Sequence, residues 1–376
     1  MFNLIFSKIR NYLRTRNDDI DLEVSDGCEI QSNIIWATDC VDIISQCCAI
    51  CYNTDISNKS YDDKATYIGK RIASGHESIC RHSNIVIHIF FPDKNQISDK
   101  YSNDIDEVID ACRYVKHKII THANTKSILL SGSIAGYKWI IRHISNNNNS
   151  VLKCIMDELY KFNSTFFQDF IDDGIMNESL FEDLKLFSQF KPVEIKESTD
   201  KIDIINMDNI KYVYDKMSKY GYSEYDLMDF LTVTIKFKNM PRIISQQVMR
   251  HDAEPTQASQ RYINYSKGSF IQPLNVDLEK EVTFNLFGQD ITTKIKNIGP
   301  ELIKIYESLV NAGLRKEQAR SFLPNHMATD FYMTFTFRNI IHFLAMRLDK
   351  AAQIDVQVFA KDIDSLITSY LNINNS

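Results

Sequence analysis

The densest group of hydrogen-bonding side chains in the sequence lies between Gln246 and Ser266. Gln247 and Arg250 are three residues apart and would share one face of a helix, whereas Ser259 and Arg261 follow a proline in an extended or turning loop. The planar fork of an arginine suits phosphate, and amide and hydroxyl groups can bond the edge of a pyrimidine or a ribose. The stretch predicts an anion site, and the alternative is a solvated polar loop.

A second group of chemically competent residues lies between Ala319 and Val356. Arg338 and His342 are four residues apart and share a helix face, whereas Arg347 lies nine residues beyond Arg338, about half a turn round. We therefore expect the two arginines to contact different partners. The alternative is an amphipathic helix whose arginines pair with acids or extend along apolar surface.

Composition sets the broad class of the protein. The chain has 376 residues, which predicts two or three domains, and 44% of them are apolar, as in soluble globular proteins. Forty-three Lys and Arg against forty-nine Asp and Glu give a net charge of −6, which argues against a protein that grips nucleic acid over a wholly basic surface. The sequence contains no apolar run of about 18 residues, so no membrane span is expected.

The eight cysteines do not suggest a disulfide framework in a chain of this length, so we expect a reducing compartment. Cys48 and Cys51 form a CxxC pair, but no second pair or suitably spaced histidine follows. We therefore expect helix packing for these cysteines rather than a zinc or redox site, and no metal site.

Periodicity predicts the elements that must position these residues. The N-terminal predictions are a basic amphipathic helix over 1–16, a linker over 17–35 and a buried helix over 39–52 capped by Asp39. They are followed by a second helix ending near a left-handed Gly75, a strand over 84–91, a strand, turn and helix over 127–143, and a helix over 151–167. Further on, we expect a strand over 230–238 with one solvent-exposed face and a helix that begins at Pro241. Residues 93–228 contain no catalytic-looking cluster and are predicted to be an insertion. No fixed-period repeat is visible.

Taken in order along the chain, these motifs resemble those of the flavin-dependent thymidylate synthases. The family signature is Arg-His-Arg, seven residues, then Ser-x-Arg-Tyr, which Arg250-His251 and Ser259-Gln260-Arg261-Tyr262 resemble. The segment GHESICRH at 75 to 82 resembles a Gly-His-Glu element that ends in a flavin-binding histidine. ARSFLP at 319 to 324, the arginine-bearing helix and Ala352-Gln353 resemble the family's C-terminal arm. The resemblance covers about residues 36 to 92 and 229 to 360.

The resemblance implies a role for each matching residue. The residues expected to hold deoxyuridylate (dUMP) are Gln247, Arg250, Gln257, Ser259, Arg261, Arg320 and Arg347. The residues expected near the flavin are His82, Arg250, His251, Arg338 and His342. Arg347 and Ser259 are expected to take part in catalysis, Ser259 as a ligand and not as a nucleophile.

The implied reaction transfers a one-carbon unit from methylenetetrahydrofolate to C5 of dUMP and completes the methyl group with hydride from NADPH through FAD. The implied fold is α/β, with a mixed sheet flanked by helices, in a catalytic domain of residues 36–92 and 229–376 that surrounds the insertion. The resemblance also implies a homotetramer with active sites between subunits, in the cytoplasm or in a host cytoplasm if the chain is viral.

The chain departs from the signature at three positions. The loop is one residue short, with Asp252 where the third signature residue, an arginine, is expected. Gln257 replaces a frequent glutamate, and Thr336 replaces a usual asparagine. These departures leave two alternatives open: a related flavoenzyme that modifies C5 of a pyrimidine nucleotide differently, for example by hydroxymethylation, or a catalytically degenerate homologue.

Overall fold

The structure is a computed structural model that describes residues 30–91, 101–122, 125–144, 146, 148–162, 166, 199 and 201–373. The predicted basic helix over 1–16 lies outside the described residues, as does most of the linker. Residues 31–35, expected in that linker, instead begin the first strand.

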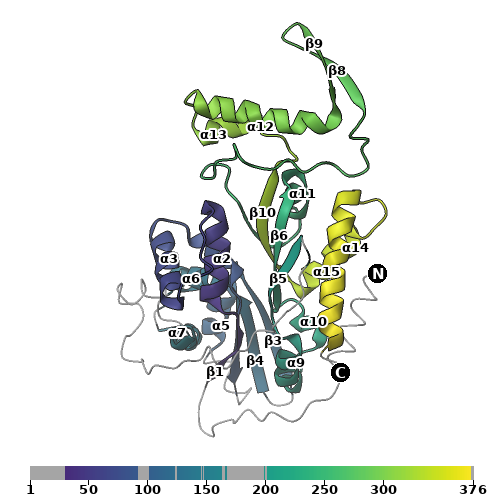
Figure 1. The fold of residues 1–376 in the computed structure, drawn as a ribbon. Coiled ribbons are helices and arrows are strands. Elements are labelled where there is room, and N and C mark those ends of the chain that lie inside the picture. Colours follow the sequence, from purple (N-terminus) through teal and green to yellow (C-terminus); the bar gives the residue numbers. More distant parts are fainter. Residues whose placement is uncertain are drawn as a thin grey trace.

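Two four-stranded sheets form the body of the molecule (Figure 1). The first contains, in order across it, β1 (Gln31–Ala37), β2 (Ile85–Phe91), β4 (Thr125–Gly132) and β3 (Val115–His122). The second contains β5 (Ile202–Met207), β6 (Thr232–Pro241), β10 (Ala328–Thr336) and β7 (Glu254–Gln257). The predicted α/β class is confirmed, but all of these strand pairs are antiparallel, so the strands form two antiparallel sheets where one mixed sheet was expected.

Helices cover the sheets and join them into one body. Those in the first half of the chain are α2 (Cys40–Tyr52), α3 (Tyr61–Ala73), η1 (Glu77–His82), α5 (Ser102–Ala111), α6 (Ile134–His143) and α7 (Ser150–Phe162). Those in the second half are α9 (Ile210–Met217), η5 (Ser218–Tyr220), α10 (Glu224–Leu227), α11 (Arg242–Val248), α14 (Phe337–Arg347) and α15 (Ile354–Ile373). Helix α2 packs against β7 and β10 of the second sheet, so a single hydrophobic core runs through both halves.

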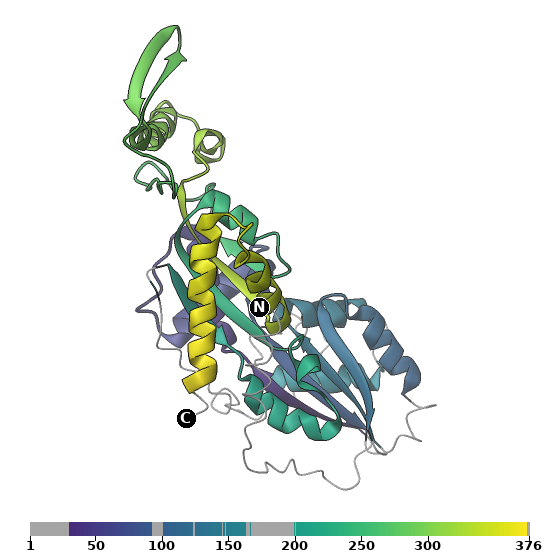
Figure 2. The ribbon, with the colours of Figure 1, turned by 90° about the vertical axis from the view of Figure 1, so that its right-hand side faces the viewer.

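An arm projects from the body, as both ribbon views show (Figures 1 and 2). It consists of the hairpin β8 (Glu281–Leu286) and β9 (Gln289–Lys294), followed by α12 (Ile295–Asn311), α13 (Lys316–Ala319) and η6 (Arg320–Phe322). The arm has a small core of its own, which is separate from that of the body. In the sequence the arm lies between β7 and β10, so it separates the two motifs that carry chemistry.

Several local predictions are confirmed. Asp39 caps α2 by accepting a hydrogen bond from the amide of Asp42 at 3.1 Å, and Gly75 has a φ of 88°. Cys48 is buried and Cys51 is half-buried on α2, and burial raises the pKa of both thiols. Helix packing therefore explains them.

The predicted wet face of β6 is only partly correct. The strand begins at Thr232, and Lys236 and Lys238 are half-buried. Thr234, expected on the same wet face, is fully buried because its hydroxyl bonds that of Thr334 at 2.8 Å. No described helix is long and apolar enough to cross a membrane.

Candidate functional site

Arg347 and His251 connect the two chemically competent stretches of the sequence. Arg347, at the end of α14, donates from Nε to Nε2 of His251 at 2.9 Å. Burial, then the positive charge of Arg347 and the neighbouring His342, lower the pKa of His251 to about 4. His251 is therefore neutral near pH 7 and can accept this hydrogen bond.

Gln247, Arg250 and His342 complete this group, which we call the arginine–histidine cluster. Gln247 on α11 accepts from Arg347 through its backbone oxygen at 3.5 Å and donates from its side chain to Gln353 at 2.6 Å. Arg250 is exposed, and its charge contributes to a lowered pKa of Arg347, after burial as the main cause. The cluster places cationic and amide donors at the end of one buried helix.

A second group of predicted ligands lies where the arm joins the body. Arg320 is exposed on η6. Burial lowers the pKa of Arg242, and the positive charge of Arg320 lowers it further. The Nη1 atom of Arg242 is buried and has no hydrogen-bond partner. Two mutually repelling guanidinium groups, one with an unsatisfied donor, suit a dianionic ligand.

Ser259 and Arg261 belong to the same joint. The Ser259 hydroxyl accepts from the amide of Arg261 at 3.2 Å, and Nε of Arg261 lies 3.8 Å from Glu317. Tyr262 stacks on Tyr52 of α2 with ring centroids 5.0 Å apart. No hydrogen bond or ion pair among the described residues links these groups directly to the arginine–histidine cluster.

The remaining predicted ligands already have partners. Arg338 donates to Asp229 at 2.5 Å and to the backbone oxygen of Tyr225 at 2.7 Å, so it contacts different residues from Arg347, as expected. Gln257 donates to the hydroxyl of Ser245 on α11 at 2.6 Å. The shortened signature loop is held by α14, because Asn339 donates to the Asp252 backbone and carboxylate, both at 2.9 Å.

His82 is buried beneath β10 and β7. One ring nitrogen lies 2.9 Å from the hydroxyl of Thr334 and the other 2.6 Å from that of Thr256. Only 1% of the side chain is exposed, so His82 cannot contact a ligand without a rearrangement of these threonines. It supports the strands that carry the signature loop.

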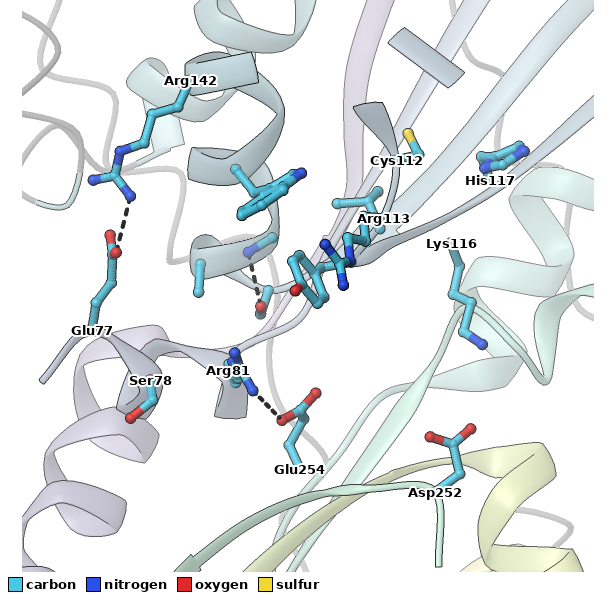
Figure 3. A pocket seen from close by; sticks show the side chains of 16 residues that line it. Glu77, Ser78, Arg81, Cys112, Arg113, Lys116, His117, Arg142, Asp252 and Glu254 are labelled. Atoms are coloured by element: carbon cyan, nitrogen blue, oxygen red, sulfur yellow. Dashed lines mark hydrogen bonds and ion pairs between the residues drawn. The ribbon is translucent and has the colours of Figure 1, made fainter. Parts of the chain in front are cut away.

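A cleft of about 620 Å³ opens between the two halves (Figure 3). Arg81, Arg113 and Lys116 extend into it from the first half, opposite Asp252 and Glu254 from the second. None of the predicted dUMP or flavin ligands lines it. Asn339, in the first turn of α14, reaches an adjoining hollow, whereas Arg347 ends that helix about 12 Å away. The arginine–histidine cluster, and not this cleft, contains predicted cationic and imidazole ligands.

Comparison with known proteins finds a family that is similar to the second half of the chain. Residues 187–370 match the family model of the thymidylate synthase complementing protein. The match includes the signature loop and α14 but not the segment at 75 to 82.

Over these residues the chain is similar to the thymidylate synthase complementing protein family.

Curated proteins named flavin-dependent thymidylate synthase are also similar to this chain. The protein of Pyrococcus abyssi is 27% identical over 168 residues, which are 43% of this chain and 64% of that protein. Those of Dictyostelium discoideum and Thermotoga neapolitana are 29% and 30% identical and cover 42% and 32% of this chain. The chain thus spans less than two thirds of the length of these relatives.

Several polar residues of the site were not identified as ligands from the sequence. Arg242 and Asp229 interact with predicted ligands, and Thr256 and Thr334 hold His82. Two residues had an available signal: Gln353, which bonds Gln247, lies in the motif Ala352-Gln353, and Arg242 lies on the helix that carries Gln247. Among the described residues no group of three or more His, Cys, Asp or Glu side chains is arranged for a metal.

Acid should destabilise the chain through His82. Burial lowers its pKa from 6.5 to about 4, so the stabilisation is fully present above pH 6.5 and is lost as the pH falls toward 4, by up to about 3 kcal/mol. Urea unfolding at pH 7.0 and 4.5 measures this loss. His82→Gln should flatten the dependence, leaving the part due to His88 and His251, whose pKa values are also lowered to about 4. An unchanged slope would contradict the prediction.

Proposed function

We propose that the chain is a flavin-dependent thymidylate synthase that methylates dUMP at C5 with methylenetetrahydrofolate and NADPH. The observation that carries this proposal is the contact between Arg347 and His251. It brings together two arginine-bearing stretches nearly 100 residues apart in the chain, both within the family match. A polar surface loop and an unrelated amphipathic helix would have no reason to meet in this way.

The residues of the arginine–histidine cluster fit a planar ligand that becomes anionic. Arg347 and Arg250 supply positive charge, and exposed His342 and neutral His251 supply faces and edges for a ring system. We propose that His251, Arg250 and His342 hold FAD. When bound, FAD would supply hydride to the one-carbon unit. Arg338, bonded to Asp229 and Tyr225, would position the first turn of α14 and contact the flavin only if that ion pair opens.

The residues at the joint of the arm fit the phosphate of dUMP. Nη1 of Arg242 has no hydrogen-bond partner, and the positive charge of Arg320 lowers the pKa of Arg242. Arg261 carries the third guanidinium and gains a stronger partner if phosphate replaces Glu317, which lies 3.8 Å away. Gln247 and Gln257 would bond the uracil edge, and Ser259 would act as a further ligand.

The chain's own contribution to the reaction is placement and charge. Arg347 would hold the uracil carbonyl and stabilise the negative charge that develops on the ring during attack at C5. Because His251 is neutral, it does not add repulsion to Arg347 and keeps its guanidinium directed. The homotetramer implied by the resemblance remains a prediction.

Absorption spectroscopy of the purified protein, followed by dUMP addition, tests this function. We expect a flavin spectrum that changes on addition of dUMP, and dTMP as the product by mass when both co-substrates are present. A hydroxymethylated product would favour the related C5-modifying enzyme. A colourless protein that takes up no FAD would refute the proposal.

Arg261→Ala should weaken dUMP binding about tenfold, because it removes one charge-assisted contact to phosphate. Calorimetric titration of dUMP into the protein measures this change. Arg315→Ala is the matched control, since Arg315 also lies within 4 Å of Glu317 but is not a predicted ligand. Equal dUMP affinity of the Arg261 variant and this control would contradict the phosphate assignment.

A further inference from the structure

The two halves of the chain follow the same order of elements. Each half begins with a strand, three helical segments, a second strand and a helix. Two further strands and then two helices follow, in residues 31–162 and again, apart from the arm, in residues 202–373. The strand orders β1-β2-β4-β3 and β5-β6-β10-β7 are the same order twice. Among the described residues the arm is the main addition in the second half, and it stands where only two residues separate β3 from β4 in the first half.

The strand register repeats as well. β1 pairs with β2 through Ala37 and Ile85, with an irregularity between Ile34 and Trp36. β5 pairs with β6 through Met207 and Val233, with an irregularity between Ile204 and Asn206. Measured from these pairs, the bulge occupies the same place in both sheets. Bulges are specific features of a fold, so their coincidence argues against a chance likeness.

The residues that follow the first strand of each half make the same bonds. In the first half the amide of Thr38 donates to the Asn84 oxygen at 3.0 Å, and the amide of Asn84 donates to the Thr38 hydroxyl at 2.9 Å. In the second half Asp208 and Thr232 repeat both bonds, at 2.9 and 2.6 Å. The next residue caps the following helix in each case.

Caps and register fix which residues are equivalent. Asp39 caps α2 and Asn209 caps α9, whereas Ser133 caps α6 and Thr336 caps α14.

We propose that residues 31–162 are a diverged second copy of the unit formed by residues 202–373. We further propose that this copy is a built-in partner, covering the face that the C-terminal unit would otherwise offer to another chain.

The contacts between the two copies are reciprocal. Ser131 donates to the backbone oxygen of Phe230 at 2.6 Å, and Thr334 bonds His82 at 2.9 Å. Ser131 is the equivalent of Thr334, and His82 is the equivalent of Phe230. Each copy therefore presents the same two positions to the other, which is the property of a twofold pair.

Charge makes this pairing selective. Arg81 and Asp229 are equivalent positions, as are Lys116 and Glu254. Across the cleft Arg81 lies 3.6 Å from Glu254, and the reciprocal positions, Lys116 and Asp229, line the same hollow. Two identical copies would instead place like charges opposite one another at both contacts. The exchange of sign favours the internal pair over self-pairing of either unit.

The first copy lacks the chemistry of the second. Ala135, Trp139 and Ile144 stand at the positions of Arg338, His342 and Arg347. Resting on the proposed function, this difference implies one FAD and one dUMP per chain. The first copy serves the site as a positioning partner, through His82 and through Tyr52 beneath Tyr262.

Cross-linking of the full-length protein tests the built-in partner. In the Arg81→Cys/Glu254→Cys variant a short bis-maleimide should join the two positions within one chain, giving a single-chain mass on a denaturing gel. The two single-cysteine variants are the controls for the native thiols. Links between chains at low protein concentration, or no link above the controls, would overturn the proposal.

A charge cycle tests the selectivity. Arg81→Glu and Glu254→Arg should each lower the thermal midpoint by about 2 °C or more and increase self-association in sedimentation, and the double variant should recover both. Lys304→Glu, on an exposed pair of the arm, is the control. Additive losses in the double variant would refute the charge argument.

Ligand stoichiometry separates this inference from the proposed function. One FAD per chain, by absorbance against protein mass, is expected, and two per chain would overturn the inequality of the copies. Absence of FAD would defeat the proposed function, and the cross-link and charge cycle would still decide the pairing.

Discussion

Arg347→Ala is expected to lower kcat/KM for dUMP by about 100-fold or more, the range seen when a donor to developing negative charge is removed. Arg347 donates to His251 at 2.9 Å and has its pKa lowered by burial and by the charge of Arg250, so its removal takes away the cation bonded to His251. The pKa of His251 should rise at the same time, because one of the charges that lower it is gone.

Steady-state kinetics with dUMP and NMR titration of His251 measure the two effects. Arg347→Lys retains charge without the planar fork, so it should recover part of the activity. Lys350→Ala, an exposed cation three residues on, is the control. Unchanged kinetics in the alanine variant would remove Arg347 from the site, and a His251 pKa that does not move would contradict its contact with that arginine.

Asp208→Ala is expected to lower the free energy of unfolding by about 3 to 5 kcal/mol, the cost of leaving several buried donors without an acceptor. The fully buried Asp208 carboxylate accepts from the Trp36 indole at 2.7 Å, from the Asn84 amide at 2.8 Å and from the backbone of Thr232 at 2.6 Å. Trp36 and Asn84 belong to the first copy, so the loss falls on the junction of the two halves.

Urea unfolding at pH 7 measures this effect. Asp208→Asn keeps the shape but loses charge and an acceptor, so its loss should be smaller. The control Asp215→Ala removes a partly exposed carboxylate paired with Lys211 and should change stability by less than about 1 kcal/mol. A loss at Asp208 no greater than this control would show that the junction does not depend on the carboxylate.

Local sequence signals predicted the elements well where one residue determines the geometry. Asp39 supplies a capping carboxylate and Gly75 permits a positive φ. The helix predicted to begin at Pro241 begins one residue later, at Arg242, because Pro241 ends β6. Thr234 shows the limit of such signals. Alternation predicts that its side chain is wet, and only the hydroxyl of Thr334, 100 residues further on, makes its burial favourable.

The internal copy was not predicted from the sequence, because equivalent residues of the two halves share geometry and not chemistry. Thr38 and Asp208 accept hydrogen bonds from equivalent backbone amides, and Ser133 and Thr336 cap equivalent helices. The positions that differ most, such as Arg81 and Asp229, are those where a difference favours pairing. The site was more visible, because Arg250 and Arg347 lie in motifs whose residue types directly suggest anion binding, although their contacts depend on tertiary structure.

The separate core of the arm has a consequence for ligand affinity. Tyr265, Ile303, Tyr306, Ala319 and Met327 form that core, and the arm joins the body through a few backbone bonds, such as that from Arg242 to Met327. Such a unit opens locally at a lower free energy than the body, and amide hydrogen exchange should be faster in α12 than in β6. Because Arg261 and Arg320 lie on this joint, part of the binding free energy of a phosphate is used to hold the arm closed, and the bound ligand should slow that exchange.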